Sequence, residues 1–175
     1  MALSGSVTSS AYIGGAVDGM VVLNWTATQD VLDNTSTIEW ELVGKLVNKD
    51  GTNHLASFYV VSELEVVIDG VQVYYRDSSK HTNCYTGTIL ASGTYPILHN
   101  DDGSKTFSIE IGAGIYVWDI NCTGSDTATL NSIPRASYFG TIDGNIIGSN
   151  MTVNISRASD SFTHQLWYTL GSSEW

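Results

Sequence analysis

Apolar and polar side chains alternate along much of this chain. Between positions 21 and 28 the apolar residues Val21, Leu23, Trp25 and Ala27 are separated by residues that are mostly polar. Residues 38–46 repeat the pattern, with glutamates and a lysine between apolar positions. Successive side chains of a β-strand point to opposite faces. Both stretches therefore predict long strands of an antiparallel sheet with one buried face and one wet face.

Residues that favour turns separate the alternating stretches. Residues 30–36 and 48–53 are rich in Asp, Asn and Gly, which tolerate the backbone angles of tight turns. The Asp69-Gly70 dipeptide lies between two further alternating stretches and predicts a hairpin with a two-residue turn. More strands are predicted downstream, and glycines inside them predict bulges or sharp bends at Gly112, Gly114 and Gly124.

Alternating stretches and turn residues follow one another along the chain, and no stretch has the period of a helix. This pattern predicts an all-β fold. We expect an antiparallel β-sandwich, Ig-like or jelly-roll-like, over residues 1–131. Residues 132–137 read as a connector, because Pro134 cannot join a central ladder. Alternation then restarts. Residues 138–175 are too few for a core of their own, and we interpret them as the opening strands of a second, incomplete β-domain.

The chain is acidic. Its 175 residues include 7 Lys and Arg against 18 Asp and Glu, a net charge of −11. A surface of this sign repels phosphate groups, which argues against nucleic acid and membranes as partners. No basic and apolar leader and no run of 18 apolar residues is present, so we expect a soluble chain made in the cytoplasm.

Two cysteines, Cys84 and Cys122, are too few for a disulfide framework and are not arranged as a CxxC pair. We expect two reduced and mostly buried thiols. The alternative is a single disulfide between them.

The segment HNDDGSKTF, residues 99–107, has the composition of either a metal site or a turn. A calcium loop of the EF-hand type needs alternating oxygen ligands and a glutamate at position 12, and this segment has neither. A hairpin turn accounts for each residue, with side-chain oxygens accepting backbone N–H groups two residues on and Gly103 at positive φ. We predict the turn, with a looser calcium site as the alternative.

Neither a metal nor a cofactor is expected elsewhere. The histidines are scattered, without ligand spacing, and are predicted as isolated surface or strand residues: His54, His81, His99 and His164.

We expect no catalytic activity, because the sequence contains no nucleophile motif, phosphate loop or metal motif. Two glutamate pairs are nominees for a hydrolase, which needs an acid and a partner carboxylate several ångströms away: Glu39 with Glu41, and Glu63 with Glu65. Because each pair lies opposite an apolar strand face, we interpret these side chains as solvated.

Aromatic residues near polar ones suggest a carbohydrate-binding surface, since exposed rings stack on sugar faces while amides and carboxylates bind hydroxyls. Trp25 and Trp40 fall on apolar faces and are predicted as core. Residues 74–85 are predicted as a polar loop edged by tyrosines. Together with the face of residues 116–119 they provide the candidate binding residues: Tyr74, Tyr75, Arg76, Tyr85, Tyr116, Trp118 and Asp119. The alternative is that these rings pack between sheets.

Two motifs carry a resemblance to a known family. The first contains His99, Asn100, Asp102, Gly103 and Lys105, and the second is IPRAS at residues 133–137. Their order, about 30 residues apart, resembles tail-associated proteins of long-tailed bacteriophages and prophages, long labelled siphovirus proteins of unknown function. The resemblance covers roughly residues 90–170.

The resemblance implies a virion component of the tail, baseplate or tail fibre, made in the bacterial host. It implies other tail proteins and further copies of the chain as partners, with threefold or sixfold symmetry. A host cell-surface glycan is the third expected partner, bound through the sandwich. Two alternatives remain: a purely structural tail subunit, and a carbohydrate-binding module of a cell-wall hydrolase.

Overall fold

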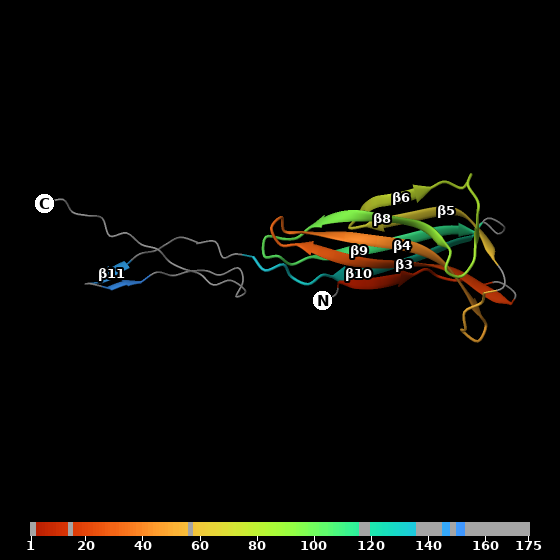
Figure 1. Ribbon diagram of the computed structural model, residues 1–175, viewed down its shortest axis with the longest axis horizontal. Helices are drawn as coiled ribbons and strands as arrows, with labels where there is room; N and C mark the ends of the chain where they lie inside the picture. The colour runs from red at the N-terminus through yellow and green to blue at the C-terminus, as the bar shows by residue number, and fades with distance from the viewer. Residues whose placement is uncertain are drawn as a thin grey trace.

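A computed structural model describes residues 3–13, 16–55, 58–115, 120–135, 145–147 and 150–152. Two antiparallel sheets pack face to face, which confirms the predicted all-β sandwich (Figure 1). A separate short hairpin joins β11 (Asn145–Ile147) to β12 (Asn150–Thr152). Most of the predicted second domain, residues 138–175, lies outside the described residues, and its assignment stays a prediction.

The first sheet has the strand order β1-β3-β4-β8, with β2 also paired to β3. Its two central strands run antiparallel over their whole length because the turn between them brings Asp30 opposite Thr35. The strands are β1 (Ser4–Thr8), β2 (Tyr12–Ile13), β3 (Val17–Asp30), β4 (Thr35–Asn48) and β8 (Ile89–Leu98).

The second sheet has the order β10-β9-β5-β6, with β7 also paired to β5. The predicted hairpin at Asp69-Gly70 joins β5 to β6, and both residues have positive φ, 54° and 76°, as a primed two-residue turn requires. The strands are β5 (Tyr59–Ile68), β6 (Val71–Arg76), β7 (Thr82–Cys84), β9 (Thr106–Ile115) and β10 (Ile120–Thr129).

The core lies between the two sheets and follows the predicted alternation. Trp25 and Trp40 are both buried, as expected. They face each other across β3 and β4, and each ring lies over a glycine on the next strand outward: Gly5 pairs with Trp25, and Gly93 pairs with Trp40. Trp25 and Phe107 of the second sheet pack edge to face, with ring centroids 5.4 Å apart. A row of Gly, Trp, Trp and Gly therefore fills the centre of the sandwich.

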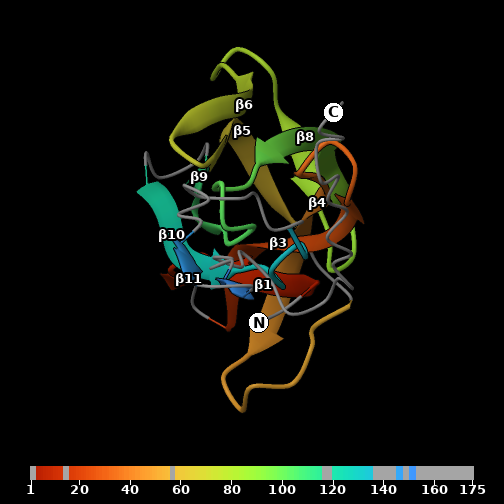
Figure 2. The ribbon, with the colours of Figure 1, turned by 90° about the vertical axis from the view of Figure 1, so that its left-hand side faces the viewer.

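The sandwich is closed along one long edge. Seen from the end at which residues 130–135 leave the sheets, β1 lies beside β10 (Figure 2). The amide of Ser10 donates to the Thr123 carbonyl at 2.7 Å, and the Thr123 amide donates to Ser10 Oγ at 3.2 Å. Gly124 permits this approach, since a Cβ there would lie 2.5 Å from the Thr8 carbonyl oxygen.

Both cysteines are free and buried, as predicted. Burial raises the pKa of the Cys84 and Cys122 thiols. We expect an aromatic disulfide reagent to modify both about 100-fold more slowly in the native protein than after unfolding, because a protonated, enclosed thiol reacts poorly. The measurement is the thiol reaction rate with and without denaturant. Fast reaction of either native thiol would contradict this.

The same thiols predict a pH dependence of stability. Their folded pKa values lie above the ordinary thiol value of about 8.5, so unfolded thiols lose protons first as pH rises. The contribution of the thiols to stability is therefore complete below about pH 8.5 and is lost above it. Denaturant titrations between neutral and alkaline pH will measure the loss, and Cys84→Ala will reduce it.

Candidate functional site

The outer face of the second sheet holds an exposed aromatic ring beside carboxylates. Strand register places Tyr75 of β6 opposite Glu65 of β5, Glu65 opposite Gly112 of β9, and Gly112 opposite Thr123 of β10. Directly opposed residues point to the same face of a sheet. One row across four strands therefore presents the ring of Tyr75, the carboxylate of Glu65 and the hydroxyl of Thr123 on the same face. Gly112, which has no side chain, leaves a gap between Glu65 and Thr123 that we call the glycine gap.

Hydrogen bonds fix the aromatic end of this row. The Tyr75 hydroxyl donates to Glu63 Oε1 at 3.0 Å, and Gln72 Nε2 donates to Glu65 Oε1 at 2.6 Å. Bonding to Glu63, together with its charge, raises the pKa of Tyr75, so the phenol stays a donor. Tyr75 is 52% exposed, so its side chain is accessible to a ligand.

A groove of about 490 Å³ begins at Glu65 and runs across the glycine gap. The absence of a side chain at Gly112 deepens the groove. A Cβ there would lie 3.7 Å from the Cβ of Glu65, an ordinary contact distance, so alanine would also fit at this position. The walls supply carboxylates and hydroxyls, and the lining residues are Glu65, Val67, Glu110, Ile111, Gly112, Thr123, Gly124 and Ser125. We call the surface made by Tyr75, Gln72, Glu63 and this groove the Tyr75 face.

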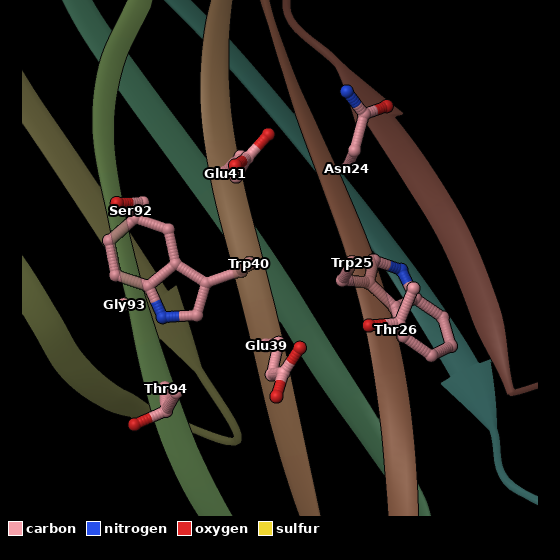
Figure 3. Close-up of a pocket in the computed structure, with 9 residues that line it drawn as sticks. All are labelled: Asn24, Trp25, Thr26, Glu39, Trp40, Glu41, Ser92, Gly93 and Thr94. Atoms are coloured by element: carbon pink, nitrogen blue, oxygen red, sulfur yellow. The ribbon is translucent and has the colours of Figure 1, made fainter.

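A second groove, of about 480 Å³, crosses the outer face of the first sheet. Figure 3 shows the carboxylates of Glu39 and Glu41 on the central strand, between Asn24 and Thr26 on one side and Ser92 and Thr94 on the other. Trp25, Trp40 and Gly93 complete the lining, but both indole rings are buried. This groove offers hydrogen bonds and no exposed ring among the residues that line it.

The structure separates the residues predicted to bind carbohydrate. Tyr75 lies on the outer face, whereas Tyr74 turns inward and packs edge-on against Trp40, with ring centroids 6.1 Å apart. Arg76 is half-buried and has structural partners: its guanidinium donates to Thr82 Oγ1 at 2.8 Å and to the Val61 carbonyl at 3.2 Å.

Of the remaining candidates, the structure describes Tyr85. The exposed ring of Tyr85 packs against Phe58, with centroids 5.3 Å apart. Tyr116, Trp118 and Asp119 lie outside the described residues. Their neighbours Ile115 and Ile120 pair at the end of the sandwich opposite the connector, where β7 also lies, since Val61 pairs with both Ile115 and Thr82.

The prediction of a continuous polar loop over residues 74–85 was wrong. Tyr74, Tyr75 and Arg76 continue β6, because they complete the ladder opposite Leu64–Val66. Residues 82–84 form β7 on the same neighbour, β5. The loop is confined to residues 77–81, where Asp77 accepts hydrogen bonds from the amide and hydroxyl of Ser79.

The turn predicted at HNDDG is confirmed. Asp102 Oδ1 accepts the amide of Ser104 at 2.9 Å and its hydroxyl at 2.6 Å, and Gly103 has φ 79°. These bonds lower the pKa of Asp102. The prediction of His99 as an isolated surface or strand residue was wrong: His99 is 3% exposed, with Nε2 2.7 Å from Ser36 Oγ and Nδ1 2.7 Å from the Gly103 carbonyl.

The described residues contain neither a metal-binding cluster nor a membrane-spanning helix. No three His, Cys, Asp or Glu side chains in this part of the chain gather as a metal site would require. No helix there is long and apolar enough to cross a membrane.

Fold and surface together define a β-sandwich module with polar grooves on both outer sheet faces. The chain belongs to a bacteriophage family: the family model described as "Siphovirus protein of unknown function (DUF859)" matches residues 20–175. This confirms the siphovirus part of the resemblance seen in the sequence. No curated protein and no solved structure matched the chain.

Sequence reasoning missed both grooves. It considered Glu39, Glu41, Glu63 and Glu65 in pairs along single strands and left out the neighbouring strands. The signal that could have found the Figure 3 groove is the set of polar residues that alternate with apolar ones in β3, β4 and β8. Asn24, Glu41 and Ser92 form one cross-strand row of the Figure 3 groove, but the strand order that aligns them is not readable from one sequence.

Proposed function

We propose that this siphovirus protein is a non-catalytic component of the phage tail that contributes to host attachment, and that its Tyr75 face binds a neutral cell-surface glycan. The observation that carries the proposal is the row Tyr75, Glu65, Gly112 and Thr123. An exposed ring beside acceptors and hydroxyls is the combination that stacks on a sugar and binds its hydroxyl groups.

Charge supports a neutral ligand. The Tyr75 face carries Glu63, Glu65 and Glu110, and the whole chain has a net charge of −11. Anionic wall polymers would be repelled from such a surface, whereas carboxylates accept hydrogen bonds from neutral sugar hydroxyls without that cost.

The absence of catalysis is part of the proposal. Glu63 and Glu65 already accept hydrogen bonds from Tyr75 and Gln72, and Glu39 and Glu41 are exposed on an open sheet face. A glycosidase acid usually needs a desolvated environment that raises its pKa. Release of reducing ends from host wall by the protein, lost on changing any of these glutamates to Gln, would contradict the proposal.

The test is a glycan array with the full chain, followed by titration of the best-binding glycan. Tyr75→Ala is expected to weaken binding about tenfold or more, because it removes the stacking ring. Tyr75→Phe retains the ring and is expected to keep affinity within about threefold. Glu41→Gln in the Figure 3 groove serves as the control and should leave affinity unchanged.

Two outcomes would overturn this assignment. If Glu41→Gln abolishes binding and Tyr75→Ala does not, the glycan site lies on the other sheet. If no glycan binds while the chain still assembles with tail proteins, the attachment role fails and the purely structural alternative holds.

A further inference from the structure

The two sequence motifs that carry the family resemblance meet in space. The HNDDG turn joins β8 to β9, and residues 130–135 follow β10, at the same end of the sandwich (Figure 1). The amide of Ile133 donates to the Gly103 carbonyl at 2.9 Å, and the amide of Leu130 donates to the Lys105 carbonyl at 3.0 Å. Ile133 is 1% exposed, so the predicted connector is anchored against the sheets at this residue.

Gly103 is the centre of this contact. Its carbonyl accepts two hydrogen bonds, from Ile133 N and from Nδ1 of His99. Its α-carbon faces Ile133 so closely that a Cβ would collide with the Ile133 carbonyl oxygen and would lie 3.1 Å from Cγ of Arg135. A side chain of any size at position 103 therefore displaces the backbone of Ile133.

The turn itself is held by the rest of the sandwich. His99 N donates to the Asn34 carbonyl at 3.0 Å, and Asn34 Nδ2 donates to the carbonyls of His99 and Asn100. Lys105 forms an ion pair of 2.7 Å with Asp69 in the β5–β6 hairpin. Turns from both sheets are thus tied to the turn that holds Ile133.

We infer that His99, Gly103 and Ile133 form a clamp, a rigid joint that fixes the direction in which the chain leaves the sandwich. The clamp is independent of any ligand on the Tyr75 face. Through it, the HNDDG turn holds residues 133–135 in one orientation against the sandwich. Because Ile133 lies outside the strands, a substitution that breaks the clamp should release this segment while both sheets stay folded.

Hydrogen exchange and backbone relaxation on the full chain test the clamp. In the wild type, the Ile133 amide should be protected and have an order parameter near about 0.85. Gly103→Ala is expected to lower the protection of Ile133 about tenfold or more and its order parameter below about 0.6, while Ile109 in β9 stays protected.

Gly87→Ala is the matched control. Gly87 has φ 87°, close to the 79° of Gly103, but has no atom within 4 Å of the Cβ position. Both variants carry the backbone cost of alanine at positive φ, and only Gly103→Ala displaces Ile133. Loss of Ile133 protection in Gly87→Ala would contradict the clamp, as would an unprotected Ile133 in the wild type.

A second variant covers the case in which Gly103→Ala unfolds the sandwich. Ile133→Ala removes the buried side chain without touching the turn. It should lower protection at residue 133 and leave Ile109 unchanged. Equal loss at both positions would show that the segment unfolds only with the sheets and would overturn the clamp.

Discussion

Gly44→Ala is expected to destabilise the sandwich by about 3 kcal/mol or more, the upper range for overpacking a core. Gly44 is buried in β4 beside Cys84, and a Cβ there would collide with Cys84 Sγ and lie 2.9 Å from the Tyr85 carbonyl oxygen. The neighbouring backbone is fixed, because the Gly44 amide donates to the Thr88 carbonyl and the Gly44 carbonyl accepts from the Gly87 amide. Denaturant unfolding followed by circular dichroism measures the loss.

Two variants make this prediction specific. Gly112→Ala also replaces a strand glycine, but its Cβ finds ordinary space, so stability should change by less than about 1 kcal/mol. Adding Cys84→Ala to Gly44→Ala removes the colliding sulfur, and the double variant should lose less than the sum of the two single losses. Strict additivity would show that the collision with sulfur is not the cause.

Trp40→Ala is expected to cost about 3–5 kcal/mol, the usual range for removing a large buried ring. The ring lies over Gly93 and packs against Tyr74 of the other sheet, so its loss opens a cavity between the layers. The measurement is again the free energy of unfolding. Thr94→Ala, on the exposed face of the adjacent strand, is the control and should stay within about 0.5 kcal/mol.

Gly93 supplies a further check on the tryptophan row. A Cβ at Gly93 would lie 2.8 Å from the Trp40 ring, so Gly93→Ala alone should destabilise the protein. In the Trp40→Ala background the same change meets empty space and should be neutral or stabilising. If Gly93→Ala costs the same in both backgrounds, the ring does not depend on the glycine.

The alternation of apolar and polar residues predicted the strands well, because every second side chain of a strand points to the buried face of its sheet. The Asp69-Gly70 turn has the backbone angles that its residue types favour. The alternate apolar residues of both stretches are buried as expected: Val21, Leu23, Trp25, Ala27, Ile38, Trp40, Leu42 and Leu46. These features depend on residues that are adjacent in the chain, so a single sequence is enough to predict them.

Features that depend on strand order were not predictable in the same way. Bulges or bends were expected at three glycines. Gly114 does lie at an irregularity, opposite the register shift between Val61 and Leu64. Gly112 and Gly124 pair regularly with the neighbouring strand, and Gly124 instead admits the backbone of Thr8. The polar environment of His99 arises from Ser36, 63 positions earlier. The Tyr75 face and the Figure 3 groove each combine at least three strands, so the residues of either site become neighbours only once the sheets are assembled.

Closure of the edge between β1 and β10 also determines when the protein can fold. Ser10 pairs with Thr123, 113 positions later in the chain, and the central β5 pairs with β9. Such distant pairings place the domain among slow folders, with times of about milliseconds to seconds. During synthesis the N-terminal strand must wait for β10 to leave the ribosome, so the growing chain exposes unpaired strand edges until nearly the whole sandwich has been made.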